Sequence, residues 1–420
     1  MKRRLLKRRN DYYRHFTALD VGTDMVKALV VRRDKKEGVV LGVGREPQDP
    51  LAMSGGAIAD IEAVIQAANR ALEAAEDMAG VNPPPGQAVV GVAGELVKGF
   101  SSSAAYPRTR PEGRIRENEI RGLLNLLQKR ALREAQHLLE LERAYGDLDA
   151  RLVHSAITGV RVDGYPVANP LGFQGHNIEV TVFNTFAPLT HISAIETVVV
   201  ELDLELIGAV AQPYAIARAT AADSTYESGA IFIDIGGGTT DVALLRDGGI
   251  EGTRMFNIGG RSFTRRLATA LGIGFTEAEA KKLRHSEGLL GAEEDRQVSE
   301  HLNADTEVLL RGLTISLEEL ARGERLPSEI LLCGGGSLLP EVMTELRKPR
   351  WAEGLPFTHQ PQPRLLQPPD IKSLTDMTGL LQTPRDIGPM GLANHALRVE
   401  ADEKDLLHGV MRRVLKSMKV

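Results

Sequence analysis

The chain has 420 residues, of which 42% are hydrophobic and 25% charged, a composition typical of a soluble globular protein built from several subdomains. Aromatic residues make up only 4% and the net charge is −5, so the composition argues against nucleic acid as a partner. A single cysteine, Cys333, excludes an internal disulfide and a cysteine-cluster metal site, and no apolar run predicts a membrane-spanning helix. We therefore expect a cytoplasmic protein.

The first half of the chain starts with a flexible basic arm over residues 1–15. Behind it, FTALDVG and MVKALVVRR predict a β-hairpin with its turn at Asp20–Thr23, and VVLGVGRE predicts a third strand. A helix is expected over about Ile58–Met78 and a further strand over Gln87–Gly94.

An inserted α+β module is predicted over residues 98–186. It opens with SSSAAYPRTRPEG, which we expect to be a loop, and continues with a charged amphipathic helix at Arg116–Tyr145. Two alternating segments, HSAITGVRVDGYPV and NIEVTVFNTFAP, predict strands. A helix at Ile192–Val200 and the strand LELIGAV then resume the main chain, so one lobe is expected to comprise residues 16–97 and 187–225.

The second half repeats this order over residues 226–398 and predicts a second lobe. GAIFIDIGGGTTDVALL indicates strand, glycine turn and strand, and helices are expected over Thr276–His285 and about Ala292–Arg322. SEILLCGGGSLLPEV indicates a buried strand, a glycine turn and a helix. A proline-rich connection with a short strand at PFTHQ and a last helix at Asp386–Arg398 complete the predicted lobe.

Two of these hairpins carry an aspartate before a glycine-rich turn, in Asp20–Thr23 and in Asp234–Asp241. Glycine lets backbone N–H groups approach phosphate oxygens, threonine hydroxyls add donors, and carboxylates orient a hydrated Mg²⁺ ion. The first turn alone is equally compatible with an ordinary hairpin. A third glycine turn at Gly334–Gly336 follows a strand, and the three turns together favour a nucleotide site. The sequence has neither a P-loop nor a GxGxxG dinucleotide motif.

In order and spacing, DVGTDMVKALVV, IFIDIGGGTTDVALL and ILLCGGGSLLPEV resemble the two phosphate motifs and the adenosine motif of the superfamily that contains actin, heat-shock chaperones and sugar kinases. The resemblance covers roughly residues 16–398. It implies a duplicated, actin-like (ribonuclease-H-like) α/β fold of two lobes that binds ATP and Mg²⁺ between them.

The same resemblance implies which residues form the site. The expected cofactor-binding residues are Asp20, Gly22, Thr23, Lys27, Asp234, Gly236, Gly237, Gly238, Thr239, Thr240, Gly259, Gly260, Glu279, Lys282, Gly334, Gly335 and Gly336. Asp20, Asp234 and Asp241 are expected near the metal, mostly through water. Glu279 and Lys282 lie in TEAEAKKLRH, which resembles the segment lining ribose and adenine, although a solvated charged helix explains them equally well.

Hydrolysis would require a residue that positions the attacking water. Gln212, in AVAQPYAIA, stands where actin has a glutamine, so Gln212 and Asp234 are the catalytic candidates of what would be at most a slow ATPase. The alternative for Gln212 is a polar residue that closes a strand-to-helix turn.

The inserted module, with NPLGFQGHNIEVTVF, GFTEAEAKKLRHSEG and SLTDMTGLLQTPRDIGPMGLANHAL, resembles the FtsA family of bacterial cell-division proteins. This resemblance implies a cytoskeletal scaffold that polymerises on the inner face of the cell membrane and tethers the tubulin-like protein FtsZ. The inserted helix is longer than the family pattern, and region 286–328 is shorter, which leaves the interaction surfaces open.

Residues 399–420 are interpreted as a linker and an amphipathic helix that binds an anionic membrane surface. FtsA proteins end similarly. The alternative is a helix packed on the protein's own core or on a partner helix. The proposed membrane residues are Leu406, Leu407, Val410, Met411, Arg412, Arg413, Val414, Leu415, Lys416 and Met418.

Two other functions remain open. A PilM-like scaffold of type IV pilus assembly has the same fold and inserted module, is cytoplasmic and needs no amphipathic tail. A small-molecule kinase of the superfamily is less well supported, because the sequence offers no candidate general base in a substrate pocket. A chaperone is disfavoured because no β-rich peptide-binding domain follows the core.

Overall fold

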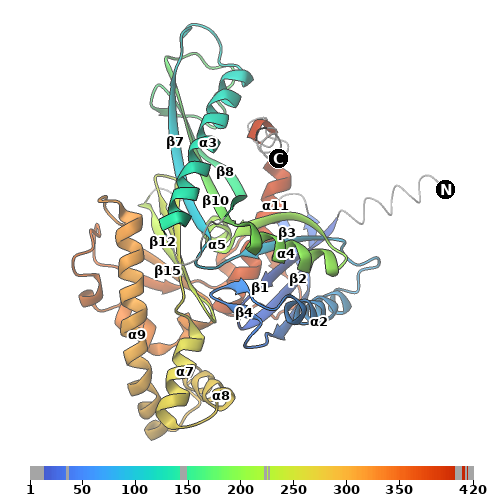
Figure 1. Cartoon of the computed structure of the whole chain (residues 1–420), viewed down its shortest axis with the longest axis vertical. Coiled ribbons are helices and arrows are strands. Elements are labelled where there is room, and N and C mark those ends of the chain that lie inside the picture. The colour runs from blue at the N-terminus through green and yellow to red at the C-terminus, as the bar shows by residue number, and fades with distance from the viewer. Residues whose placement is uncertain are drawn as a thin grey trace, which may run out of the picture.

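The computed structural model consists of two lobes side by side, with a third module projecting from them (Figure 1). It describes residues 14–34, 37–141, 149–221, 225, 228–402, 409–411 and 414. Most of the predicted basic arm therefore lies outside the described residues. The alternation of strands and helices confirms the predicted two-lobed α/β fold.

The first lobe is built on a six-stranded sheet with the order β11-β6-β1-β2-β3-β17 in the described part of the chain. Its strands are β1 (His15–Val21), β2 (Met25–Asp34), β3 (Glu37–Pro47), β6 (Gln87–Val92), β11 (Glu205–Ala211) and β17 (Leu374–Asp376). The strands β1, β2 and β3 are antiparallel neighbours, whereas β6 pairs in parallel with both β1 and β11. The small hairpin of β4 (Met53–Ser54) and β5 (Ala57–Ile58) stands apart.

Helices pack on this sheet because its strands are apolar on both faces, as a sheet buried on both sides requires. The helices of the lobe are α2 (Ile61–Ala79), α4 (Leu189–Glu201), α5 (Gln212–Thr220) and α11 (Ile387–Asp402). Helix α2 begins after Asp60, whose side chain accepts a hydrogen bond from the backbone N–H of Ala63, and ends at the left-handed Gly80. It contacts β2 and β3, whereas α11 contacts β1, β2 and β6.

The end of the chain returns to this first lobe, which corrects the predicted boundary of the second lobe at residue 398. Strand β17 pairs in parallel with β3, and α11 packs on α5 and on the first sheet. A parallel partner so distant in sequence leaves no local pattern, and residues 374–398 had therefore been assigned to the wrong lobe.

The second lobe holds five strands in the order β16-β15-β12-β13-β14. They are β12 (Ala230–Ile235), β13 (Thr240–Arg246), β14 (Gly249–Phe256), β15 (Glu329–Cys333) and β16 (Gln362–Leu365). The lobe's helices and 3₁₀ turns are α7 (Gly260–Leu271), α8 (Phe275–Ser286), α9 (Ala292–Ala321), η2 (Gly335–Leu338), α10 (Pro340–Leu346) and η3 (Pro349–Ala352). The connection back to the first lobe contains η4 (Pro368–Asp370) and η5 (Pro384–Asp386). The strand predicted at PFTHQ was misplaced, since β16 starts two residues after it and only Phe357 forms an isolated bridge.

The inserted module consists of one helix against an antiparallel sheet. Its elements are β7 (Lys98–Pro107), α3 (Glu117–Leu141), β8 (Ala150–Val162), β9 (Tyr165–Pro166) and β10 (Asn177–Pro188). The loop predicted at SSSAAYPRTRPEG was wrong over its first half, because β7 pairs with β10 from Lys98 to Pro107. The same strand also pairs with β14 of the second lobe, so within the described residues the module and the second lobe share one nine-stranded sheet.

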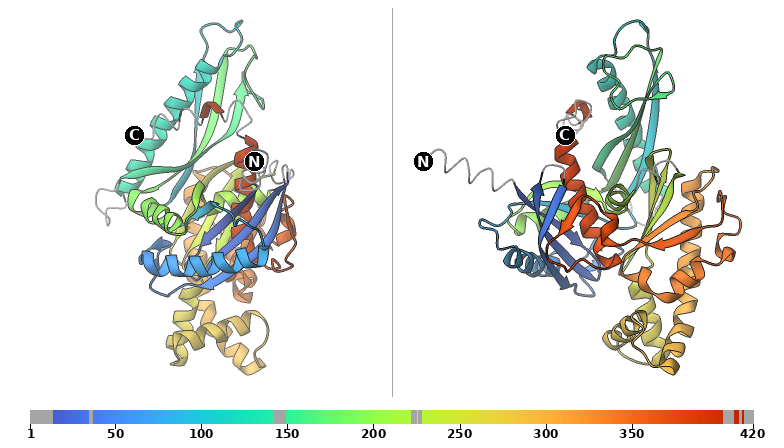
Figure 2. Two further views of the ribbon diagram at one scale, coloured as in Figure 1. Left: turned by 90° about the vertical axis from the view of Figure 1, so that its right-hand side faces the viewer. Right: turned by 180° about the vertical axis from the view of Figure 1, so that it is seen from behind.

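The described residues near the C-terminus, 409–411 and 414, lie next to the module, as the views of Figures 1 and 2 together show. Val410, Met411 and Val414 are buried in the same hydrophobic cluster as residues of α3, β8 and β10. The other residues predicted for a membrane helix, Leu406, Leu407, Arg412, Arg413, Leu415, Lys416 and Met418, lie outside the described residues. In the part of the chain that the structure describes, no helix is long and apolar enough to cross a bilayer.

Candidate functional site

A cavity of about 440 Å³ lies between the two lobes, a size suited to a nucleotide-sized ligand. All three glycine turns that the sequence singled out contribute to its wall, at Asp20–Thr23, at Gly236 and Gly237, and at Gly334–Gly336. The two halves of the duplicated fold thus face each other across one cavity, as the sequence predicted.

The two phosphate hairpins are placed by strand register. In the first, Asp20 pairs with Lys27 across β1 and β2; in the second, Asp234 pairs with Asp241 across β12 and β13. The tips of the hairpins touch, since a Cβ added to Gly237 would lie 2.5 Å from the Cβ of Asp24. Only a residue without a side chain permits this approach of the two backbones.

Three buried carboxylates gather at the base of these hairpins, those of Asp20, Asp234 and Asp241. Burial raises the pKa of all three, and it raises that of Asp234 to about 6. Lys27 is their nearest cation, with Nζ 3.6 Å from Oδ2 of Asp20, and its charge opposes the rise for Asp20 and Asp234. With all three carboxyls ionised, the cluster would carry more negative charge than Lys27 alone compensates.

This cluster suits a hydrated divalent cation. Oδ1 of Asp241 is buried and has no hydrogen-bond partner among the described residues, which leaves an acceptor oriented toward no protein donor. No group of three acidic, histidine or cysteine side chains in the described ranges is arranged to ligate one ion directly. The residues thus fit a Mg²⁺ ion held through water, the mode in which this ion keeps most of its hydration shell.

The third glycine turn, Gly334–Gly336, lies at the end of β15, which pairs in parallel with β12. Gly334 has a φ of +82°, and a Cβ there would lie 2.2 Å from Oδ1 of Asp234. A Cβ on Gly336 would meet Cγ2 of Ile235 at 2.3 Å, whereas a Cβ on Gly335 would only reach ordinary contact with Nε of Arg385 at 3.7 Å. The turn is thus pressed against the hairpin of β12 and β13 through Gly334 and Gly336, and Gly335 is the less crowded position.

Glu279 and Lys282, on α8, both line the cavity. Nζ of Lys282 donates to the carbonyl oxygen of Gly260 (2.9 Å), to Oγ1 of Thr264 (2.8 Å) and to Oε2 of Glu279 (2.8 Å). This side chain joins α8 to α7 and is buried, so the solvated-helix alternative does not hold for Lys282.

Gln212 lies beside the first hairpin. Its side chain hydrogen-bonds to the carboxylate of Asp20 and lines the cavity at the first residue of α5. Both catalytic candidates, Gln212 and Asp234, therefore border the same cavity.

Three predicted residues support the turns from behind and do not line the cavity. Thr240 donates through Oγ1 to the carbonyl oxygen of Ile258 (2.6 Å). A Cβ on Gly259 would lie 2.7 Å from the carbonyl oxygen of Gly236, and one on Gly238 would lie 2.8 Å from Cγ2 of Thr23. The remaining predicted residues, Gly22, Thr23, Thr239 and Gly260, line the cavity.

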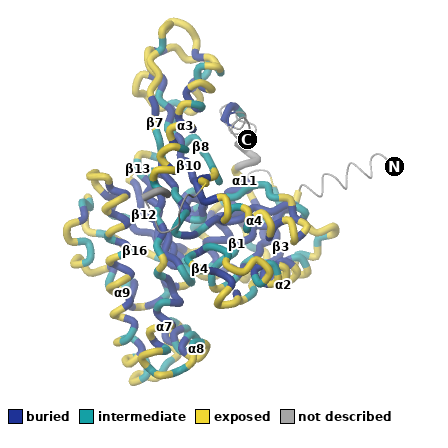
Figure 3. Tube along the Cα trace, in the orientation of Figure 1, coloured by how far each residue is buried: buried dark blue, intermediate teal, exposed yellow. Residues whose placement is uncertain are grey.

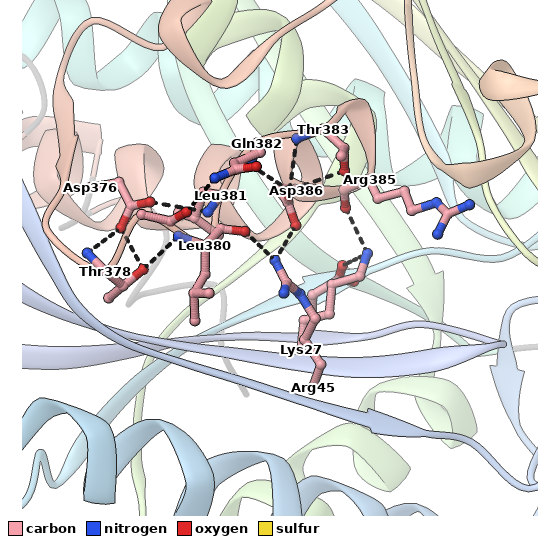
Figure 4. A network of polar contacts seen from close by, with 12 residues as sticks. Lys27, Arg45, Asp376, Thr378, Leu380, Leu381, Gln382, Thr383, Arg385 and Asp386 are labelled. Atoms are coloured by element: carbon pink, nitrogen blue, oxygen red, sulfur yellow. Dashed lines mark hydrogen bonds and ion pairs between the residues drawn. The ribbon is translucent and has the colours of Figure 1, made fainter. Parts of the chain in front are cut away.

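Sequence reasoning missed the part of the cavity wall formed by residues 380–388, several of which belong to the polar network in Figure 4. Arg45 on β3 donates to Oδ1 of Asp386 (2.7 Å) and to the carbonyl oxygen of Leu380 (2.9 Å). Nζ of Lys27 donates to the carbonyl oxygen of Arg385 at 2.8 Å. One local signal for this segment exists in the sequence. In T-P-R-D, Thr383 and Asp386 have the spacing of a capping box, and the structure shows this capping box at the start of η5.

A second missed residue, Arg261, bridges the lobes. It stands in the first turn of α7, and its Nε lies 3.3 Å from Oδ1 of Asp24 in the first hairpin. Its Nη1 donates to the carbonyl oxygen of Pro50 at 3.1 Å. The residue follows the Gly259–Gly260 pair, but nothing in its sequence context predicted a contact across the cavity.

The sequence of this chain is similar to those of known cell-division proteins. The model of the family "Cell division protein FtsA" matches residues 231–371. Cell division protein FtsA of Pseudomonas aeruginosa is 27% identical over 407 residues, which cover 91% of this chain and 89% of that protein. FtsA of Neisseria meningitidis serogroup B is 25% identical, covering 93% and 92%.

Among solved structures, one described as "PilM-PilN type IV pilus biogenesis complex" superposes with a TM-score of 0.63 at 17% identity. The match covers 91% of this chain and 98% of that chain. At this identity the likeness establishes the shared actin-like fold and nothing about partners.

Proposed function

We propose that this chain, which is similar to FtsA proteins over most of its length, is an ATP-binding scaffold of bacterial cell division. The observation that carries the proposal is the combination of whole-length similarity to FtsA proteins with one cavity bordered by all three glycine turns. A division role explains both the sequence similarity and the site.

In this proposal the backbone N–H groups of the turns at Gly22 and Gly237 bind the phosphates from opposite lobes. Lys27 supplies the positive charge on the first lobe, and Gly335 leaves room for the adenosine. A bound Mg²⁺ ion would supply positive charge that balances the ionised, buried carboxylates. Gln212, next to Asp20, orients a water molecule for slow hydrolysis.

A ligand held by both lobes stabilises their closed arrangement, because it contacts each of them. We propose that closed protomers associate into filaments and that the C-terminal helix attaches these to the inner face of the cell membrane. A single amphipathic helix binds weakly, whereas a filament presents many helices at once and binds by avidity. The tubulin-like protein FtsZ is the proposed partner.

A PilM-like role in pilus assembly is the second candidate, favoured by the structural match. The relatives with whole-length sequence similarity are FtsA proteins, which favours division. A kinase acting on a small metabolite is the third and weakest candidate.

The test is binding of ATP followed by pelleting with anionic vesicles and with FtsZ from the same organism. We expect Mg²⁺-dependent ATP binding, filaments on the vesicles in electron micrographs, and co-pelleting of FtsZ. Asp20→Asn is the matched variant that should lose the nucleotide response, while Asp60→Ala, at the exposed start of α2, should keep it. Tight binding of ATP without any association with FtsZ would contradict the division role.

A further inference from the structure

The C-terminal segment is packed against the inserted module in this structure. The exposed fractions of Val410, Met411 and Val414 are 0%, 3% and 1%, and all three belong to the hydrophobic cluster formed by α3, β8 and β10. Figure 3 shows dark blue, buried stretches in this segment beside the module. In place of solvent, these side chains contact the interior face of the module.

The buried residues are the ones that a membrane would need. Positions 410, 411 and 414 lie on one face of a helix, and this face is also the apolar side of the proposed membrane helix. A side chain enclosed in the module cannot be inserted into a lipid headgroup region at the same time. Docking on the module and binding to a membrane therefore exclude each other.

The part of the module that contacts Met411 contains buried polar side chains. Nε2 of Gln128, on α3, donates to Oγ of Ser155 (2.7 Å) and to Oδ1 of Asn184 (2.8 Å), and it lies 3.9 Å from the sulfur of Met411. Oδ1 of Asn184 also accepts from Oγ of Ser155 at 2.8 Å. Oε1 of Gln128 is buried without a hydrogen-bond partner in the described ranges. Fully satisfied buried polar groups are the rule in permanent cores, so this part of the module is better suited to a contact that opens.

The docked segment is connected directly to the cavity. Helix α11 starts at the cavity wall, where a Cβ on Gly388 would lie 3.3 Å from Oδ2 of Asp20 and 2.5 Å from Nε2 of Gln212. The helix packs on the first lobe and also touches the module, where the rings of His395 and His154 lie 4.9 Å apart; the module in turn continues the sheet of the second lobe. The segment that follows α11 thus spans from one lobe to a module hydrogen-bonded to the other.

From these contacts we propose that the module carries a docking site for the chain's own C-terminal helix, and that this site competes with the membrane for the helix. Docked, the helix is withheld from lipid. Movement of the second lobe around a nucleotide would displace β7 and β10, which form part of the docking surface, and would shift the helix toward release. The competition rests on the membrane role proposed above, whereas the docking does not.

The test uses a cysteine pair in the full-length chain, Gln128→Cys with Met411→Cys, joined by a short bifunctional thiosulfonate reagent. These side chains are in contact, and the native Cys333 is buried, so the native background is low. Leu126→Cys with Met411→Cys is the matched control, because Leu126 is 43% exposed on another face of α3. Only the first pair should cross-link within one chain.

Cross-linked and reduced samples are then compared by flotation with vesicles of phosphatidylglycerol and phosphatidylcholine in equal parts. We expect the cross-linked protein to lose most of its vesicle binding and to regain it on reduction. ATP with Mg²⁺ should lower the cross-linking yield. Unchanged vesicle binding after cross-linking would overturn the competition.

Failure to cross-link within one chain would overturn the docking, and a cross-linked dimer would move it to a second copy. If the reduced protein binds no vesicles, the membrane role and the competition both fail, whereas the cross-linking yield still reports on the docking by itself.

Discussion

Replacing Asp234 by asparagine is expected to stabilise the protein without nucleotide while removing its response to Mg²⁺ and ATP. The carboxylate is buried, and the neighbouring Asp20 adds to the effect of burial. Lys27 and the thiol of Cys333 oppose that effect without cancelling it, and the pKa of Asp234 is therefore raised from 3.8 to about 6. The ionised group is thus a source of instability that a cation would remove.

The magnitude follows from this pKa difference. A folded-state pKa above the unfolded value means that the folded protein binds the proton more tightly, so stability falls as pH rises from about 4 to about 6. Above that range the full penalty is present, and the interval from 3.8 to about 6 corresponds to about 3 kcal/mol. Asparagine avoids this penalty, which already includes the attraction to Lys27, so we expect a net gain of about 1–3 kcal/mol at pH 7.5.

Thermal unfolding of both proteins between pH 5 and 8, with and without Mg²⁺ and ATP, checks this reasoning. The variant should melt a few degrees higher at pH 7.5, and the difference should shrink to about half of that at pH 5. Mg²⁺ with ATP should raise the melting temperature of the wild type far more than that of the variant. A variant less stable than the wild type at pH 7.5, with the same dependence on pH, would refute the argument.

Gly334→Ala should lower the free energy of unfolding by about 2–5 kcal/mol, from its positive φ and the clash with Asp234, as measured by denaturant titration. Gly335→Ala is the matched control and should change it by no more than about 0.5 kcal/mol, because its nearest neighbour atom is 3.7 Å away; equal losses would contradict the turn geometry. Lys27→Met should weaken ATP binding about 10- to 100-fold in a fluorescence titration, and unchanged affinity would remove Lys27 from the phosphate site. Gln212→Ala should slow phosphate release about tenfold or more while ATP affinity is retained; a parallel loss of both would make it a structural residue.

The sequence predicted those parts of the site that depend on local geometry. A glycine turn between two apolar strands carries its own signal, since the residues that form it are adjacent in the chain. Asp20 and Lys27 face each other because a tight hairpin fixes their register. These features were accessible without knowledge of the fold.

The missed wall depends on contacts that no local pattern records. Arg45 and Asp386 are 341 positions apart and come together only after β17 has paired with β3. In the module, the run of serine and alanine in β7 has low intrinsic preference for a strand. Its pairing with β10 over ten residues imposes the conformation, and tertiary context overrides propensity. Sequence patterns predict structure least well where the conformation of a segment depends on pairing with another segment far away in the chain.

The join between the inserted module and the second lobe explains why the module can respond to events at the cavity. Strand β14 continues from the second phosphate hairpin and pairs with β7 through Gly252 with Phe100 and Thr253 with Gly99. A Cβ on Gly99 would lie 2.2 Å from Oγ1 of Thr253, so the join requires glycine for the close approach of the two strands. The module is thus joined to the second lobe by strand pairing and to the first lobe by the contacts of β8 with β11 and α4. In the proposed mechanism, a change in the angle between the lobes would therefore act on the surface that docks the C-terminal helix.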